Sequence, residues 1–372
     1  MNNTKLEQYH KAKPLEGIVR GLMYLYILTI PFQSIGFSLM GLPIGLPEIV
    51  LFVLSPLAII HTMRSNKKPL INKMDIFVFG WLIATIISGW HSGFDSIVVT
   101  EIIKTAYLIV LYTILKWTIT LGIIERIIKV IILSCLIASL TAIIGFGITY
   151  FSLDTSLAIK RHFPYGIQNI IQAKGFTPSP NMLASIIMPG VFFHLQKLSK
   201  NQIGSNVQDY VILIILLLGF SLTFSKTVIC LLIGMILILH FNNKSILTYT
   251  WRLIIRIAVS SLLITYIFGT HFIIIKKGGT SKLLIGDYIA GSALIETSNY
   301  SIYPSQYLSL KKISFEAISN TFPWGTGPGK FNYYTNLLKK NDLYPTHVAY
   351  PDPHSTYLGI LAEIGFIGFL AL

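Results

Sequence analysis

The C-terminal stretch PDPHSTYLGILAEIGFIGFLAL, residues 351–372, joins a polar segment to an apolar run. A helix needs about 20 mostly apolar residues to cross the hydrocarbon core of a bilayer. The run from Ser355 to Leu372 is close to that length, and it begins directly after His354, which lies behind two prolines. This junction predicts a membrane helix that carries a histidine at its polar end.

Similar apolar runs fill most of the chain. Apolar residues make up 53% of the sequence and charged residues 12%, well below the roughly 25% charged residues of an ordinary soluble domain. We therefore expect an all-α polytopic membrane protein with about ten transmembrane helices, at Gly17–Leu39, Ile44–Met63, Asp75–Trp90, Ile97–Leu115, Ile123–Tyr150, Met182–Leu198, Asp209–Phe224, Lys226–Phe241, Arg252–Ile275 and Ser355–Leu372.

These runs divide the chain into four parts. We expect a tail at residues 1–16, helices one to nine at 17–275, a long loop at 276–353 and helix ten at 354–372. The long loop has aromatic residues throughout and a helical pattern at Gln306–Ser319. Since structureless loops of this length are uncommon, we expect it to fold as a small helical cap.

Lysine and arginine are concentrated in every second connection between the predicted helices. They are frequent in the N-terminal tail and after the second, fourth, sixth and eighth runs, whereas the loops Met40–Pro43 and His91–Ser96 contain none. Because cytoplasmic loops of membrane proteins collect positive charge, this alternation places the N-terminus in the cytoplasm. The long loop then lies on the external side.

Several cations fall on the external side despite that rule. The net charge is +14, and Lys226 lies in a short turn between two apolar runs, where a cation needs a polar partner or must reach the interface. Lys226 is either an interfacial lysine or an anion-binding one. The other cations predicted on this side are Lys160, Arg161, Lys174, Lys276, Lys277, Lys282, Lys311, Lys312, Lys330, Lys339 and Lys340.

His354 lies at the external N-terminus of the last predicted helix, with Ser355 as a plausible N-cap. The partial positive charge of a helix N-terminus favours a bound anion and disfavours protonated imidazole. His354 is therefore suited to act as a general base, and Asp352 could orient its ring. The alternative is a histidine that only satisfies backbone groups at the helix start.

Two glycine- and proline-containing segments are further candidates for a binding site. The segment GTGPGKF, residues 325–331, is similar to a phosphate loop, but no strand precedes it and its spacing differs from nucleotide-binding patterns. Alternatively, it is a tight turn whose glycines adopt positive φ. The segment Lys174–Asn181 would place Lys174 at the external surface with Asn181 as a helix N-cap, or it is simply a capped loop.

The sequence contains no His, Asp and Glu cluster at metal-ligand spacing and no serine or cysteine nucleophile motif, so we expect neither a metal nor a cofactor. Glu363 lies inside the last run, about 13 Å along the helix from His354. An acid at that depth is expected to face a cavity or a paired cation. Lys104 is likewise a charge inside a predicted helix.

From about Gly175 to Leu372 the chain resembles the O-antigen ligase and O-antigen polymerase superfamily, integral-membrane glycosyltransferases that use undecaprenyl-pyrophosphate-linked glycans. The resemblance is strongest at residues 325–331 and at His354-Ser355-Thr356-Tyr357-Leu358, followed by Glu363, Gly365 and Gly368. It is weaker at Gly175-Phe176, Pro180-Asn181 and Ser225-Lys226. The superfamily has more helices than the ten expected here, which implies that a C-terminal part is missing.

The resemblance implies a role for each of these residues. His354 would activate the acceptor hydroxyl, with Asp352 and Glu363 as supporting residues. Ser225-Lys226 stands where the family has a Ser-Arg pair, so Lys226 would hold the pyrophosphate, although lysine lacks the bidentate fork of arginine. A further family arginine in the loop has no equivalent, and Lys311 or Lys312 is nearest. The other residues expected to bind substrate are Lys174, Arg161, Lys330, Gly327 and Gly329.

The resemblance also implies an activity. We expect a glycosyltransferase that moves a glycan from undecaprenyl pyrophosphate to an acceptor sugar, such as the lipid A core, at the periplasmic face of a bacterial inner membrane. The expected partners are this donor, the acceptor and the bilayer, and no nucleic acid. A repeat-unit polymerase of the same superfamily is the main alternative, and a lipid-linked glycan transporter or a non-catalytic assembly protein are further ones.

Overall fold

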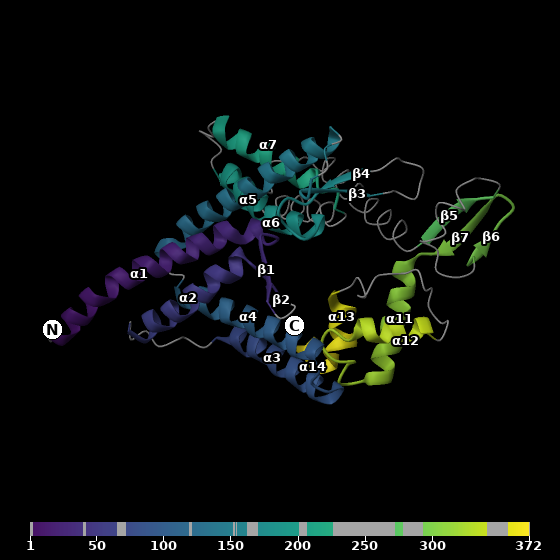
Figure 1. Cartoon of the computed structure of the whole chain (residues 1–372), viewed down its shortest axis with the longest axis horizontal. Coiled ribbons are helices and arrows are strands. Elements are labelled where there is room, and N and C mark those ends of the chain that lie inside the picture. The colour runs from purple at the N-terminus through teal and green to yellow at the C-terminus, as the bar shows by residue number, and fades with distance from the viewer. Residues whose placement is uncertain are drawn as a thin grey trace. The chain divides into compact units, whose positions relative to one another are not determined.

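A computed structural model describes residues 3–39, 42–64, 72–118, 121–151, 153, 155–161, 170–200, 207–225, 272–277, 293–340 and 356–371. The chain divides into two compact units. The first comprises Met1–Lys68, Thr113–Phe163 and Gln168–Ser261, and the second comprises Pro69–Tyr112, Pro164–Ile167 and Leu262–Leu372. Figure 1 labels the helices and strands of both units.

The first unit is built from long helices and two short hairpins. Its elements are α1 (Asn3–Thr29), the 3-10 helix η1 (Ile30–Phe32), β1 (Gly36–Leu39), β2 (Leu42–Gly45), α2 (Leu46–Arg64), α5 (Leu121–Tyr150), β3 (Ala158–Arg161), β4 (Ile170–Ala173), α6 (Pro180–Lys200) and α7 (Val207–Ser221). The strands pair as antiparallel hairpins, β1 with β2 and β3 with β4.

Helices α5, α6 and α7 share the core of the first unit. Leu183, Ile187, Leu216 and Phe220 are buried there together with small residues of α5. Gly219 of α7 packs directly on Ser139 of α5, and a side chain at 219 would overlap it. Small residues of this kind let membrane helices approach closely, so this packing is typical of a helical membrane domain.

The second unit combines two long helices with shorter helices and a small sheet. Its elements are α3 (Lys73–Ser92), most of α4 (Ser96–Thr118), β5 (Phe272–Lys276), β6 (Ile295–Glu296), β7 (Tyr300–Pro304), α11 (Gln306–Thr321), α12 (Phe331–Lys340), α13 (Thr356–Glu363) and α14 (Gly365–Leu370). The sheet is antiparallel in the order β5-β7-β6. Leu310, Ile313 and Ala317 of α11 form a core with Phe331 and Ala362.

Within the described residues, five helices are long and apolar enough to cross a membrane. They cover Leu15–Phe32, Leu46–Arg64, Lys73–Ser92, Ser96–Lys116 and Ile123–Tyr150. These spans correspond to the first five runs predicted from the sequence, and the sixth and seventh also form helices, α6 and α7. The first predicted run, Gly17–Leu39, is too long at its end, because Gly36–Leu39 is strand β1. The chain is thus a mostly helical polytopic membrane protein, while the eighth predicted run, from Lys226, lies outside the described residues.

The C-terminal end of the ninth predicted helix is a strand in the structure. The sequence predicted a helix over Arg252–Ile275, but Phe272–Lys276 is strand β5, whose residues pair with Tyr300–Pro304 of β7. Three consecutive isoleucines follow Phe272, and β-branched side chains suit an extended strand better than a helix end. The helix predicted at Gln306–Ser319 is confirmed as α11, although the expected cap also contains this sheet.

The last apolar run is also different from the prediction. Instead of one helix over residues 354–372, it forms α13 and α14, which are separated at Ile364. Gly365 has φ +78°, a conformation that L side chains rarely adopt. Its Cα lies against the backbone of Pro323 and Trp324, so that a side chain at 365 would overlap them. The break therefore makes room for the segment that precedes α12.

Candidate functional site

The glycine-rich segment joins α11 to α12. Gly325, Gly327 and Gly329 have φ values of +80°, +107° and +74°. A side chain at 325 would overlap the backbone of Glu363, and one at 327 would overlap the side chain of Ser92. The sequence-based interpretation as a tight turn with positive-φ glycines is therefore confirmed, and we call residues 322–330 the glycine turn.

Glu363, the last residue of α13, binds the glycine turn through its carboxylate. Its Oε2 accepts a hydrogen bond from the Gly329 amide at 3.1 Å, and its Oε1 accepts one from the Phe331 amide at 3.3 Å. Phe331 begins α12, so the carboxylate lies at the N-terminus of that helix, where backbone amides lack helical partners and negative charge is favoured. The acid predicted inside the last run thus caps a neighbouring helix.

The backbone at the end of α13 forms a second set of bonds. The carbonyl of Glu363 accepts from the Ser88 hydroxyl at 2.7 Å and from the Gly327 amide at 3.0 Å. The carbonyl of Ala362 accepts from the Thr326 amide at 2.8 Å. A helix break leaves backbone carbonyls without helical donors, and such carbonyls need other donors where water is absent. The carbonyls of Ala362 and Glu363 have these donors. Residue 363 therefore joins α3, α12, α13 and the glycine turn.

Lys330 fixes the glycine turn to the loop between α3 and α4. Its Nζ lies 2.9 Å from Oδ2 of Asp95 and donates to the carbonyls of Ser92 at 2.6 Å and Gly93 at 3.2 Å. An ammonium has three donors, and here each has a protein acceptor. Binding of pyrophosphate by Lys330 stays a prediction, and it would require exchange of at least one of these acceptors.

Asp95 connects this ion pair to α4. Its Oδ1 accepts from the Val98 amide at 3.0 Å, which is the N-cap bond of α4. That backbone hydrogen bond, and then Lys330, lower the pKa of Asp95 below its usual value. The loop His91–Ser96 and the glycine turn, which the charge pattern assigns to the same external side, are therefore in contact.

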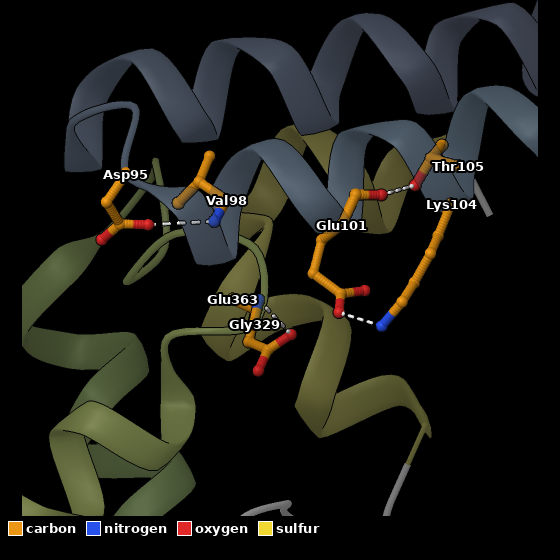
Figure 2. A network of polar contacts seen from close by, with 7 residues as sticks. All are labelled: Asp95, Val98, Glu101, Lys104, Thr105, Gly329 and Glu363. Atoms are coloured by element: carbon orange, nitrogen blue, oxygen red, sulfur yellow. Dashed lines mark hydrogen bonds and ion pairs between the residues drawn. The ribbon is translucent and has the colours of Figure 1, made fainter. Parts of the chain in front are cut away.

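Two charged side chains of α4 lie beside the glycine turn. Lys104 donates to Oε1 of Glu101 at 2.6 Å, and a Cβ added to Gly329 would lie 2.9 Å from Cγ of Glu101. Figure 2 shows both side chains on the face of α4 toward Gly329 and Glu363. Sequence reasoning missed Glu101, Asp95 and Ser88. Only the N-cap position of Asp95, directly before Ser96, offered a local signal.

A second polar cluster lies in the first unit, at the start of α6 and the end of α7. The hydroxyl of Ser225 is buried and donates to Oδ1 of Asn181 at 2.6 Å. Gln172 of β4 donates to the carbonyl of Phe224 at 3.2 Å. Two of the weaker family segments, Lys174–Asn181 and Ser225, are thus brought together.

The expected role of Asn181 as the N-cap of α6 is wrong. The helix begins at Pro180, and the Ser179 hydroxyl accepts from the Met182 amide at 3.3 Å. Proline is favoured at the first helical position because its missing N–H has no helical partner there, and this moves the cap to Ser179. The Asn181 side chain is therefore available to bind Ser225.

The remaining predicted residues are distributed over both units. Arg161 ends β3 opposite Ile170, and Lys174 follows β4, both in the first unit. Lys311 and Lys312 lie on α11 in the second unit, where Lys312 is exposed and Lys311 is half-buried. His354, Asp352 and Lys226 lie outside the described residues, so their roles stay predictions. Within the described part of the chain, no group of His, Cys, Asp and Glu could hold a metal ion.

In the part of the chain that the structure describes, five long apolar helices indicate a multi-pass membrane protein. Residues 211–372 match the O-antigen ligase family model. This part of the chain, which contains Ser225, the glycine turn and Glu363, carries an O-antigen ligase domain and confirms the resemblance drawn from the sequence. The match supports a relationship between this part of the chain and the O-antigen ligase and polymerase superfamily. No curated protein matches the chain.

Proposed function

We propose that the protein transfers a glycan from undecaprenyl pyrophosphate to a hydroxyl of an acceptor sugar, the lipid A core, on the external face of the bacterial inner membrane. The O-antigen ligase domain at residues 211–372 carries this proposal. Two of its family-like parts are in contact, because the carboxylate of Glu363 at the end of α13 binds the amides of Gly329 and Phe331.

In the proposed reaction, His354 accepts the proton of the acceptor hydroxyl, and the resulting oxygen attacks the anomeric carbon of the donor sugar. A new glycosidic bond forms as the bond from that carbon to the pyrophosphate oxygen breaks. Undecaprenyl pyrophosphate leaves with the electron pair, and cations near it stabilise the developing negative charge. Lys226 is the proposed main cation, because it follows directly after the anchored residue Ser225.

The described contacts support a preorganised site. Positions of reacting groups must be held closely, and a misplacement of about 1 Å can lower a rate about 100-fold. The helix that follows His354 is fixed at its far end by Glu363, and the residue before Lys226 is fixed by Asn181. Lys226 therefore follows an anchored residue in the sequence, and His354 precedes a helix that is anchored at its other end.

His354→Ala in a cell that lacks its own copy of the protein tests the proposal, with surface glycans separated on a gel. We expect loss of long chains on lipid A while lipid-linked polymer accumulates, at an unchanged amount of protein in the membrane. His61→Ala on α2, in the first unit, is the matched control. A normal glycan ladder would refute the base role of His354, and single-repeat products would identify a polymerase instead.

One observation favours a transporter as the second candidate. Transporter sites often lie at broken helices with charged partners, and here α13 breaks at Ile364 beside Glu363. The carbonyls of Ala362 and Glu363 are, however, bonded to the protein itself. Vesicles that contain the protein and a labelled lipid-linked glycan separate the two functions, because a transporter moves the label without any acceptor sugar.

A further inference from the structure

Glu101 and Lys104 form an ion pair within α4, the candidate span Ser96–Lys116. They lie about 8 and 12 Å along the helix from Ser96, at a rise of 1.5 Å per residue. Charged side chains at such depth are costly against lipid and normally face the protein interior or a water-filled cavity. The position of the pair thus requires a polar environment on its side of α4.

That side is the one in contact with the glycine turn. Gly329 packs on Cγ of Glu101, while its amide binds the carboxylate of Glu363 (Figure 2). The side chains of Lys104 and Glu101 are still 54% and 35% exposed. Among the described residues, the Lys104 ammonium has one acceptor, Glu101, so two of its three donors are open to a ligand.

The charge around the pair indicates what such a ligand is. Counted over the described residues around the pair, the carboxylates of Asp95, Glu101 and Glu363 outnumber the ammonium groups of Lys104 and Lys330 by one. Lys330 is already bound to three protein oxygens. This environment does not attract a pyrophosphate anion, because like charges in a confined site repel. It suits a neutral polyol, to whose hydroxyls Glu101 can accept and Lys104 can donate.

We propose that Glu101 and Lys104, together with the glycine turn, form a subsite that binds the hydroxyl groups of a sugar. This inference rests on the proposed transferase function and deepens it. It assigns the glycan to the α4 side of the second unit and leaves the pyrophosphate to other cations. It also changes the role expected for Gly327, Gly329 and Lys330, which shape this subsite instead of holding phosphate.

Binding of two probes to the purified full chain in detergent tests the subsite. One probe is sodium pyrophosphate, and the other is the glycan released by mild acid from the undecaprenyl-linked pool of the bacterium. In Glu101→Gln and Lys104→Met we expect the apparent Kd for the glycan to rise at least about tenfold, as for loss of a hydrogen bond to a charged group, with the Kd for pyrophosphate unchanged within about twofold.

The controls separate binding from folding. Glu16→Gln and Arg20→Met break an ion pair of similar spacing on α1, in the first unit, and should leave both affinities unchanged. Lys104→Arg keeps the charge and should retain glycan binding even if Lys104→Met unfolds. Glycan binding that persists in the folded Glu101 and Lys104 variants, or a selective loss of pyrophosphate binding, would overturn the subsite alone. An unchanged chain that does not bind the glycan would overturn the proposed transferase as well.

Discussion

The glycine turn and the Ser225 cluster each adjoin a residue proposed to react or bind, but they are held very differently. The glycine turn is fixed by two carboxylate contacts of Glu363, three contacts of the Lys330 ammonium and several backbone bonds. Ser225 is held by the bond of its hydroxyl to Asn181 and by a 3.3 Å bond from its amide to the Thr223 hydroxyl. The comparison indicates that the glycine turn is held rigidly, whereas the Ser225 cluster can be altered with less cost to the fold.

The largest effect is expected from Glu363→Ala. The variant leaves the amides of Gly329 and Phe331 without their acceptor, so the free energy of unfolding should fall by about 2–4 kcal/mol. Transferase activity should fall at least about 100-fold, because α13 loses its fixed end. Thermal unfolding in detergent and a transfer assay measure the two effects.

Glu363→Gln separates a positioning role from a proton-transfer role. The amide keeps one acceptor oxygen, so we expect a lower kcat with little change in KM and an unchanged pH profile. A pH profile that loses one limb in Glu363→Gln would instead show that Glu363 transfers a proton and would contradict its assignment as a helix cap.

Gly327→Ala comes next in size. Its φ of +107° strains any L residue, and the added Cβ overlaps the Ser92 side chain, so we expect a destabilisation of about 1–3 kcal/mol. Gly147→Ala on α5, which has open space for a Cβ, is the matched control and should leave the Tm unchanged. Equal Tm values for the two variants would show that the glycine turn is looser than the contacts indicate.

A smaller effect is expected at Asp95, and it depends on pH. Its pKa is lower in the folded protein, so the stabilisation by Asp95 is complete at neutral pH and is lost as the pH falls below its usual pKa of about 4. Asp95→Asn keeps the N-cap of α4 but removes the partner of Lys330, and it should cost under about 1 kcal/mol at pH 7. Its Tm should approach that of the unchanged protein as the pH is lowered, and a gap that widens would refute the ion-pair explanation.

The smallest effect on stability is expected from Asn181→Ala in the Ser225 cluster. Loss of its bond to Ser225 should lower the free energy of unfolding by about 1 kcal/mol. Transferase activity should fall by more than the loss of folded protein accounts for, because Lys226 is the residue after Ser225. Ser185→Ala one turn later on α6 controls for the helix itself. Equal activities of the two variants would leave Ser225 without a role in positioning Lys226.

The sequence predicted the parts of the structure that depend on local composition. The first five apolar runs, the α11 helix and the glycine turn follow from hydropathy, periodicity and glycine placement. It could not predict the break at Ile364, because hydropathy registers apolar side chains and not the backbone bonds that Thr326 and Gly327 make to α13. The contact of Lys330 with Asp95 also joins segments far apart in the chain, and no local pattern marks such a pair.

The contacts of Glu363 fix the C-terminal end of α13. One end of this eight-residue helix is fixed to the glycine turn, so the number of residues in α13 sets where its first residue, Thr356, lies. One residue inserted into α13 would shift its free end by about 1.5 Å and rotate it by about 100°. Replacement of one apolar side chain of α13 by another changes neither the position nor the rotation of its free end. The length of α13 is therefore under stricter constraint than the identity of most of its residues.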